Sequence, residues 1–315
     1  AHRLLSPQPP TTTTTEEPTH TPSTIVLLLR VMRPHQWIKN LTCFAGLIFA
    51  GRLFWPDMQV RALLAFITFS LTASAVYILN DLLDRSRDRL NPRTANRPLA
   101  SGQLSVPIAV ATMLLLLTLG CSGAYRLGMI CLEILIAYTI LNIFYSIRLK
   151  KTVIADVMCI AIGFVLRVLY GVYAVNVPPS SWIILCMFFL ALFLGFGKRR
   201  GEIDSLQLNA ASSRPVLQKY ASHYLDLAIT ITATLSIICY VLYCLAPQRS
   251  PAMIITVLPV AYCILRYAYQ IVVECRGQSP ERLLYTDKML WIGIIAWVAF
   301  TIAVMYGNLQ FQLEH

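Results

Sequence analysis

The residues best suited to chemistry lie in the segment that begins at Asn80. Asn80, Asp81, Asp84 and Asp88 follow one another at spacings of one, three and four residues. On a continuous helix turning about 100° per residue, their side chains fall within an arc of roughly 100°. Mg²⁺ prefers such oxygen ligands and completes its shell with waters and substrate phosphates. We therefore expect a magnesium site on Asp81, Asp84 and Asp88, with Asn80 assisting.

Basic residues surround these carboxylates. The same segment contains five arginines, which are Arg85, Arg87, Arg89, Arg93 and Arg97. Because a guanidinium binds phosphate oxygens through two parallel hydrogen bonds, arginines beside a magnesium site indicate a phosphorylated substrate. A solvated helix end is the simpler alternative for such a charged run. The position of the segment at a membrane surface, next to charges that fall within apolar spans, favours a binding site over a solvated helix end.

The elements that must position these residues are hydrophobic. Of the 315 residues, 57% are hydrophobic and only 13% are charged, whereas soluble domains carry roughly 25% charged residues. Apolar runs of about 20 residues, the length that a helix needs to cross a bilayer, recur along the chain. The nine expected spans are 38–55, 60–83, 106–124, 127–147, 153–176, 181–198, 224–246, 252–274 and 288–308. Since a backbone facing lipid must satisfy its own hydrogen bonds, the expected fold is all-α: a polytopic membrane protein with about nine transmembrane helices around a central polar cavity.

One transmembrane domain is expected over residues 25–312, starting with a short interfacial helix at residues 25–32. Residues 1–24 are rich in Pro and Thr, without an apolar run, and are expected to be a disordered tail. Residues 313–315 resemble the start of an expression-tag scar. The nine cysteines form no C-x-x-C pair, so we expect them to be packing residues.

The distribution of positive charge predicts an orientation. The net charge is +11, and 19 of the 26 Lys and Arg residues fall in the leader and in alternate loops. Cytoplasmic loops of membrane proteins carry such an excess. The N-terminus and the loops after the second, fourth, sixth and eighth spans are therefore expected in the cytoplasm, together with the charged site.

Charged residues also fall within apolar spans, namely Glu133, Asp156, Arg167, Asp226 and Arg266. A charge at membrane depth normally faces a polar cavity or a partner. Asp156 and Arg167 are eleven residues apart, which places them within about 20° of the same helix face. Opposite charges on one stripe predict a lined cavity. A structural ion pair is the alternative, although three helical turns separate the two residues.

Several motifs carry a resemblance to a known family. Residues 80–92 and the "NRPLASG" at 96–102 resemble the first aspartate-rich motif of the UbiA-type intramembrane prenyltransferases. That superfamily has nine transmembrane helices around a cavity and uses Mg²⁺ to bind a diphosphate. Other stretches are similar to its decaprenyl-phosphate phosphoribosyltransferase branch, and the resemblance covers about residues 30–300. They are "RPHQWIKN" (33–40), "YSIRLKKTVIADV" (145–157), "GFVLRVLYG" (163–171), "GFGKRRGE" (195–202), "LRYAYQ" (265–270) and "GQSPERLLYTDK" (277–288).

The resemblance implies a magnesium-dependent transfer of 5-phosphoribose from phosphoribosyl pyrophosphate to a polyprenyl phosphate of decaprenyl type, with release of pyrophosphate. Such enzymes serve synthesis of an arabinose donor for the cell wall. The expected catalytic residues are Asp81, Asp84, Asp88 and Asp156. The expected substrate-binding residues are Lys39, Asn80, Arg97, Tyr145, Lys150, Arg167, Lys198, Arg199, Arg200, Glu202, Tyr220, Asp226 and Arg266.

One departure from the superfamily bears on the donor. Aromatic prenyltransferases carry a second aspartate motif after the sixth span, where this chain has Lys198-Arg199-Arg200-Gly201-Glu202. A basic patch suits a more anionic donor, such as phosphoribosyl pyrophosphate. The alternative is a UbiA-type aromatic prenyltransferase that uses a polyprenyl diphosphate. A transporter or lipid flippase also tolerates charges inside the membrane, but broken helices in matching halves are not identifiable.

The expected setting is the inner (plasma) membrane, which the chain crosses several times with its active site towards the cytoplasm. The expected partners are the two substrates and the lipid bilayer, without nucleic acid. The sequence leaves open whether the protein forms a homo-oligomer.

Overall fold

The computed structural model describes residues 23–92, 94–208, 220–274 and 286–313, with the side chains of 204–208 and 308–313 left out. Over these ranges the chain is helical, without strands. Most of the expected tail, Glu314 and His315 lie outside the described residues. So do Arg93, Arg214, Lys219, Arg276, Arg282 and most of the motif at 277–288.

Eight helical segments within the described part of the chain are long and apolar enough to cross a membrane. They contain α3 (Pro56–Leu83), α5 (Val106–Leu127), α6 (Met129–Ile147), α7 (Ala155–Ala174), α8 (Ser181–Leu208), α9 (Ser222–Cys244), α10 (Val257–Val272), which η4 (Pro251–Thr256) precedes, and α12 (Lys288–Leu313). Each coincides with an expected span. The all-α, polytopic fold is thereby confirmed.

The first expected span, 38–55, has a different structure. After α1 (Thr24–Met32), the chain forms the 3₁₀ helix η1 (Pro34–Phe44) and the short α2 (Ala45–Phe49). With a rise of about 2.0 Å per 3₁₀ residue and 1.5 Å per α-helical residue, residues 34–49 extend about 30 Å, close to the thickness of the hydrocarbon core. This broken segment is therefore long enough for a ninth crossing, although no single long helix makes it.

Hydrogen bonds to α3 explain the 3₁₀ geometry. Trp37 Nε1 donates to Ser74 Oγ over 2.9 Å, and Asn40 Nδ2 donates to Ser70 Oγ over 3.0 Å. Three residues of a 3₁₀ helix and four residues of an α-helix both rise about 6 Å. The tighter winding thus keeps both polar side chains of η1 level with the two serines.

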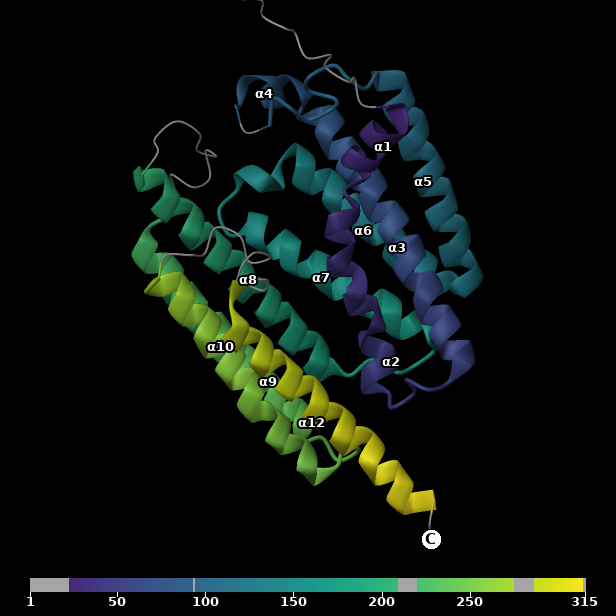
Figure 1. The fold of residues 1–315 in the computed structure, drawn as a ribbon, viewed down its shortest axis with the longest axis vertical. Helices are drawn as coiled ribbons and strands as arrows, with labels where there is room; N and C mark the ends of the chain where they lie inside the picture. The colour runs from purple at the N-terminus through teal and green to yellow at the C-terminus, as the bar shows by residue number, and fades with distance from the viewer. Residues whose placement is uncertain (1–22, 93, 209–219, 275–285, 314–315) are drawn as a thin grey trace, which may run out of the picture.

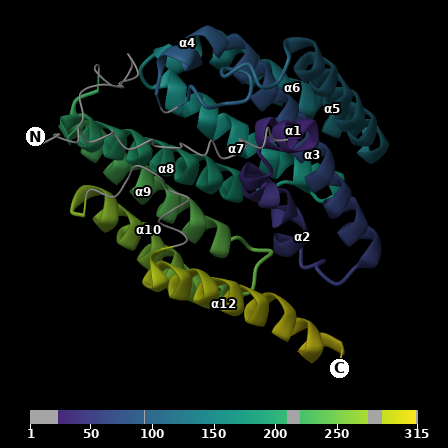
Figure 2. The ribbon, with the colours of Figure 1, turned by 45° about the horizontal axis from the view of Figure 1, so that its top comes forward.

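The helices form a bundle in which α3 and α7 are central. The η1 segment and α6 pack on both, α5 packs on α3, and α8 packs on α7. In the turned view, α8, α9, α10 and α12 follow one another across the bundle (Figure 2). The bundle closes at the end opposite α4 (Arg85–Leu90), where the backbone N–H of Leu53 donates to Tyr306 Oη over 3.0 Å.

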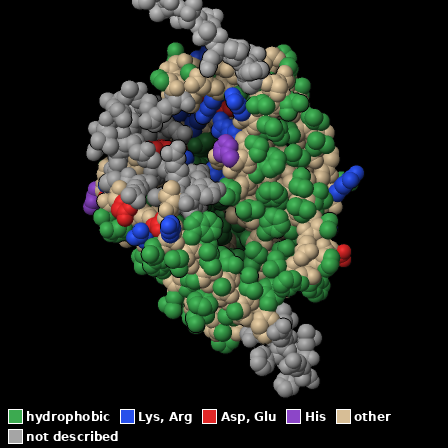
Figure 3. Space-filling model, viewed as in Figure 1, with side chains coloured by type: hydrophobic (Ala, Val, Ile, Leu, Met, Phe, Trp, Pro, Cys, Tyr) green, Lys and Arg blue, Asp and Glu red, His purple; other side chains and the backbone are tan. Residues whose placement is uncertain are grey.

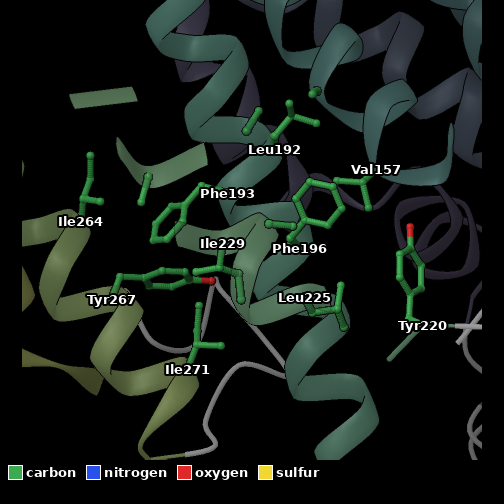
Figure 4. Packing of buried hydrophobic residues seen from close by; sticks show 14 residues of the cluster. Val157, Leu192, Phe193, Phe196, Tyr220, Leu225, Ile229, Ile264, Tyr267 and Ile271 are labelled. Atoms are coloured by element: carbon green, nitrogen blue, oxygen red, sulfur yellow. The ribbon is translucent and has the colours of Figure 1, made fainter. Parts of the chain in front are cut away.

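Two apolar clusters fix the central helices. One joins α7, α8, α9 and α10, and Figure 4 shows Phe193 and Phe196 of α8 packed among Val157, Ile229 and Tyr267. The other cluster joins α3, α6 and α7. These contacts hold α3 and α7 in a fixed relation, and those two helices carry Asp81, Asp156 and Arg167 of the site.

A glycine sets the distance between α7 and η1. A Cβ added to Gly171 would lie 2.0 Å from the carbonyl oxygen of Cys43. No side chain fits there, so only glycine lets the two backbones approach this closely. The contact places Asn40 of η1 beside Arg167 of α7.

Candidate active site

Charged side chains meet where α3 ends and α4 begins. We call six of them the mouth cluster: Asp81, Asp84, Asp88, Arg33, Arg97 and Lys150. Figure 3 shows Lys and Arg side chains gathered around a hollow in the upper part of this face, with hydrophobic side chains over much of the remainder. The charged end of the bundle is thus accessible from outside.

One guanidinium joins two of the carboxylates. Arg97 Nη1 donates to Asp81 Oδ1 over 3.1 Å and to Asp88 Oδ2 over 2.7 Å. Arg33 Nη2 also donates to Asp81 Oδ1, over 2.6 Å. Asp81 and Asp88 are buried, with exposed fractions of 2% and 7%. Their negative charges are therefore balanced by arginines and not by water.

Asp84 lies between the two helices. The helix expected to run unbroken through the motif ends at Leu83, and α4 begins at Arg85. Lys150 Nζ contacts both carboxylate oxygens of Asp84, at 2.6 and 2.7 Å. Lys150 is the middle residue of the short 3₁₀ helix η2 (Leu149–Lys151), so this pair ties the segment after α6 to the aspartate motif.

Not every arginine of the segment faces the mouth. Arg85 Nε donates to the carbonyl oxygen of Leu99 over 3.1 Å, and Arg89 Nε donates to that of Ala100 over 2.9 Å. These two arginines hold the "NRPLASG" loop against α4. Their contacts are structural. Among the residues that the structure describes, Arg33, Arg97 and Lys150 are the cations that pair with these carboxylates.

The donor atoms of the mouth cluster suit a hard divalent cation. In the arrangement present, no group of three or more His, Cys, Asp or Glu among the described residues is placed to share one metal ion. Each carboxylate instead binds an Arg or a Lys. However, Asp81 and Asp88 both bind the same nitrogen, Nη1 of Arg97, so the two carboxylates already share one cation. Carboxylates that share a cation in this way are the ligands that Mg²⁺ prefers.

A second set of charges, which we call the buried cluster, comprises Asp156, Arg199, Glu202 and Tyr220. Arg199 Nε donates to Asp156 Oδ2 over 2.7 Å, and its Nη1 donates to Glu202 Oε2 over 2.6 Å. Tyr220 Oη donates to Asp156 Oδ1 over 2.9 Å. Burial raises the pKa of Tyr220, and the charge of Asp156 raises it further, so the phenol stays protonated and can donate.

The buried cluster modifies two expectations. Asp156 is fully buried and Arg199 is 2% exposed, and both are already engaged with each other. The predicted roles of Asp156 towards ribose and of Arg199 towards phosphate stay predictions, and both would require this pair to separate. The alternative of an ion pair between Asp156 and Arg167 is wrong, because three helical turns separate the two residues and Asp156 binds Arg199.

The other predicted residues lie around these two clusters. Arg200 Nε donates to Asp226 Oδ1 over 2.8 Å, between α8 and α9. Arg266 Nε donates over 2.9 Å to Asp287, which also accepts from the backbone N–H groups of Met289 and Leu290 at the start of α12. Arg266 thus stabilises a helix N-terminus. The remaining predicted residues are half-buried: Lys39, Asn80, Tyr145 and Lys198.

Arg167 is buried within the bundle beside two residues that sequence reasoning did not select. Its Nε donates to Asn40 Oδ1 over 2.9 Å, and its Nη2 donates to Tyr138 Oη over 3.0 Å. Arg33 of the mouth cluster was also not selected. The available signal for Arg33 and Asn40 was the polar octapeptide 33–40, which they begin and end.

An all-helical bundle with a charged mouth defines a multi-pass membrane protein whose polar site lies at one end. The model of the UbiA prenyltransferase family matches residues 40–294. The decaprenyl-phosphate phosphoribosyltransferase of Mycolicibacterium smegmatis is 30% identical over 294 residues, which cover 89% of this chain and 92% of the relative. The protein of that name from Mycobacterium tuberculosis is 29% identical over 297 residues, covering 92% and 98%.

A solved structure of a UbiA homolog from Archaeoglobus fulgidus, bound to DMAPP and Mg²⁺, has the same fold. Its TM-score is 0.70 at 20% identity, covering 89% of this chain and 99% of that chain. The chain belongs to the UbiA prenyltransferase family, and it is a transferase.

Proposed function

We propose that this enzyme transfers 5-phosphoribose from phosphoribosyl pyrophosphate to a polyprenyl phosphate and releases pyrophosphate. The observation that carries the proposal is the mouth cluster, in which three carboxylates are paired with three cations at one accessible end of the bundle. The names of the relatives that match most of the chain support the same reaction.

The mouth cluster contains groups for both a metal ion and a phosphorylated donor. Asp81, Asp84 and Asp88, with Asn80, would hold Mg²⁺, which when bound neutralises charge on the pyrophosphate leaving group. Arg97 and Lys150 would then turn from the carboxylates to phosphate oxygens and donate charge-assisted hydrogen bonds. The cations that now balance the carboxylates would thus become the ligands of the donor.

The reaction needs no nucleophile from the protein. The bond between ribose C1 and the pyrophosphate oxygen breaks, and its electron pair leaves with pyrophosphate. An oxygen of the lipid phosphate forms the new bond to C1 from the opposite face. A phosphate monoester is already ionised at about pH 7, since its second pKa is about 6, so no general base has to remove a proton.

A UbiA-type aromatic prenyltransferase, with a polyprenyl diphosphate as donor, is the alternative. Two separate carboxylate sites would suit that donor. At the end of α8, the acidic side chain that the structure describes is Glu202, and Arg199 pairs with both Glu202 and Asp156. The surroundings of α8 thus favour a donor bound at one carboxylate site.

We also propose that the mouth cluster faces the cytoplasm at the plasma membrane, because the excess of Lys and Arg lies at that end. Ser101, an exposed residue beside the cluster, allows a test. A Ser101→Cys variant should react with a membrane-impermeant maleimide in inside-out vesicles and resist it in intact cells. Labelling restricted to intact cells would invert the orientation and remove cytoplasmic phosphoribosyl pyrophosphate as donor.

The reaction is tested with membranes that carry the protein. Radiolabelled phosphoribosyl pyrophosphate and a polyprenyl phosphate should give a labelled, chloroform-extractable lipid and free pyrophosphate, and chelation of Mg²⁺ should stop the reaction. Membranes with the Asp81→Ala variant serve as the matched control. If no labelled lipid forms, while a prenyl diphosphate and an aromatic acid give a prenylated product, the alternative is correct.

A further inference from the structure

Arg167 carries a positive charge inside the bundle without a carboxylate partner. Its side chain is 7% exposed, and it forms no salt bridge with any described residue. The other buried guanidinium, that of Arg199, binds two carboxylates. An unpaired charge at membrane depth is costly and marks a functional site in most membrane proteins.

Neutral groups hold Arg167 in place. Asn40 accepts from Nε and Tyr138 accepts from Nη2. The guanidinium carbon lies 5.0 Å from the ring centroids of Tyr138 and Phe164 and 5.5 Å from that of Phe69. Ring faces attract a cation, but neither they nor the two oxygens cancel its charge. The surrounding groups therefore orient the guanidinium, and its positive charge remains available to bind an anion.

The third nitrogen, Nη1, donates to no described residue. The space beside it exists because residue 163 is glycine, where even a Cβ would lie 3.6 Å from Nη1. Side chains on a helix lean towards its N-terminus, so Nη1 lies about one turn closer to the mouth than the Arg167 backbone. Gly163 is seven residues after Asp156, about 10 Å further into the bundle along α7.

We infer that Nη1 of Arg167 binds the phosphate of the acceptor lipid. The inference rests on the proposed function, which requires an anionic acceptor beneath the donor. The separation of about 10 Å along α7 between the levels of Asp156 and Gly163 leaves room for the ribose and the pyrophosphate on the mouth side of the lipid phosphate. Asn40 and Tyr138 are then positioning residues, since they hold Nε and Nη2 and direct Nη1 towards the acceptor.

Two variants test the inference through the separate KM values of the two substrates. Arg167→Gln removes the charge. Gly163→Val keeps the charge but places a branched side chain against Nη1. Each should raise the acceptor KM by about 10- to 150-fold, the range of a charge-assisted hydrogen bond, and leave the donor KM within about twofold. Gly163→Ala, whose Cβ makes an ordinary 3.6 Å contact with Nη1, should have a smaller effect than valine.

Arg61→Gln is the matched control. Arg61 also donates through Nε and Nη2, but to the carbonyl oxygens of Ala174 and Leu127 at the opposite end of the bundle. Its loss should lower the thermal stability and leave both KM values unchanged. The same result for Arg167→Gln would make Arg167 a structural residue and overturn the inference.

A binding measurement separates this inference from the proposed function. Purified wild-type protein should retain polyprenyl phosphate, detected by native mass spectrometry, in preference to the uncharged polyprenol, and Gly163→Val should lose that preference. Equal retention of both lipids by the wild type would overturn the inference even if transfer occurs. The inference would also be overturned if Arg167→Gln and Gly163→Val raised only the donor KM, since Arg167 would then bind a phosphate of the donor. Preference for the phosphate without any transfer would instead reject the proposed reaction and keep the lipid site.

Discussion

The mouth cluster and the buried cluster are made of similar groups but differ in access. Both pair aspartates with Arg or Lys at 2.6 to 3.1 Å. The cations of the mouth cluster keep exposed side-chain fractions of 14% to 32%, whereas Arg199 keeps 2%. At the mouth, water or a substrate phosphate can therefore replace a carboxylate as the partner of an Arg or Lys side chain. Separation of the buried pair would leave two charges without solvent, so that cluster stabilises the fold.

The largest effect should follow from breaking the buried cluster on one side. Arg199→Met leaves the carboxylate of Asp156 buried without its cation, and such a change costs about 3–5 kcal/mol of unfolding free energy. The measurement is thermal unfolding in detergent. The double variant Arg199→Met/Asp156→Asn should recover part of the loss because it removes the unpaired charge. A fully stable Arg199→Met protein with a raised donor KM would instead make Arg199 a phosphate ligand.

Removing a carboxylate of the mouth cluster should lower turnover severely and preserve the fold. Asp81→Ala and Asp84→Ala each remove a proposed magnesium ligand, and loss of one preorganised electrostatic contact lowers kcat by about 10²- to 10³-fold. The assay is transfer at saturating Mg²⁺ by purified variants whose unfolding temperature is close to that of the wild type. Activity near the wild-type level would show that these carboxylates do not bind the metal ion.

Lys150 should affect donor affinity more than stability. Lys150→Gln removes a charge-assisted hydrogen bond, which corresponds to about a 10- to 150-fold rise in the donor KM. Its neighbour Lys151 is exposed, and Lys151→Gln controls for the loss of one positive charge at the same end. If Lys150→Gln and Lys151→Gln raise the donor KM equally, Lys150 acts only through general electrostatic attraction and not through a specific hydrogen bond.

The smallest effect is expected for Arg200→Gln. Its partner Asp226 has an exposed side-chain fraction of 36%, and ion pairs near the surface contribute about 0–1 kcal/mol. Thermal unfolding should hardly change. The sequence predicts that Lys198, Arg199 and Arg200 bind the donor, so a rise of more than about tenfold in the donor KM, as expected from a charge-assisted hydrogen bond, would move Arg200 from a structural to a binding role.

The sequence predicted what depends on local spacing and on hydropathy. The long spans follow from apolar runs, and the proximity of Asp81 and Asp88 was expected from their seven-residue spacing, although Asp81 lies on α3 and Asp88 on α4. Pairing across the bundle was not predictable. Asp156 and Arg199 are 43 residues apart, and the sequence alone does not show that they meet. The 3₁₀ winding of η1 was also missed, because it depends on Ser70 and Ser74 of α3, which lie 30 or more residues further along the chain.

The dependence of η1 on α3 has a consequence for the biogenesis of the protein. A segment that carries Trp37, Lys39 and Asn40 in a 3₁₀ helix leaves polar groups without partners if it enters the hydrocarbon alone. Its partners on α3 are synthesised 30 or more residues later. We therefore expect stable insertion of residues 34–49 to depend on α3, with the two segments entering the membrane together as a hairpin.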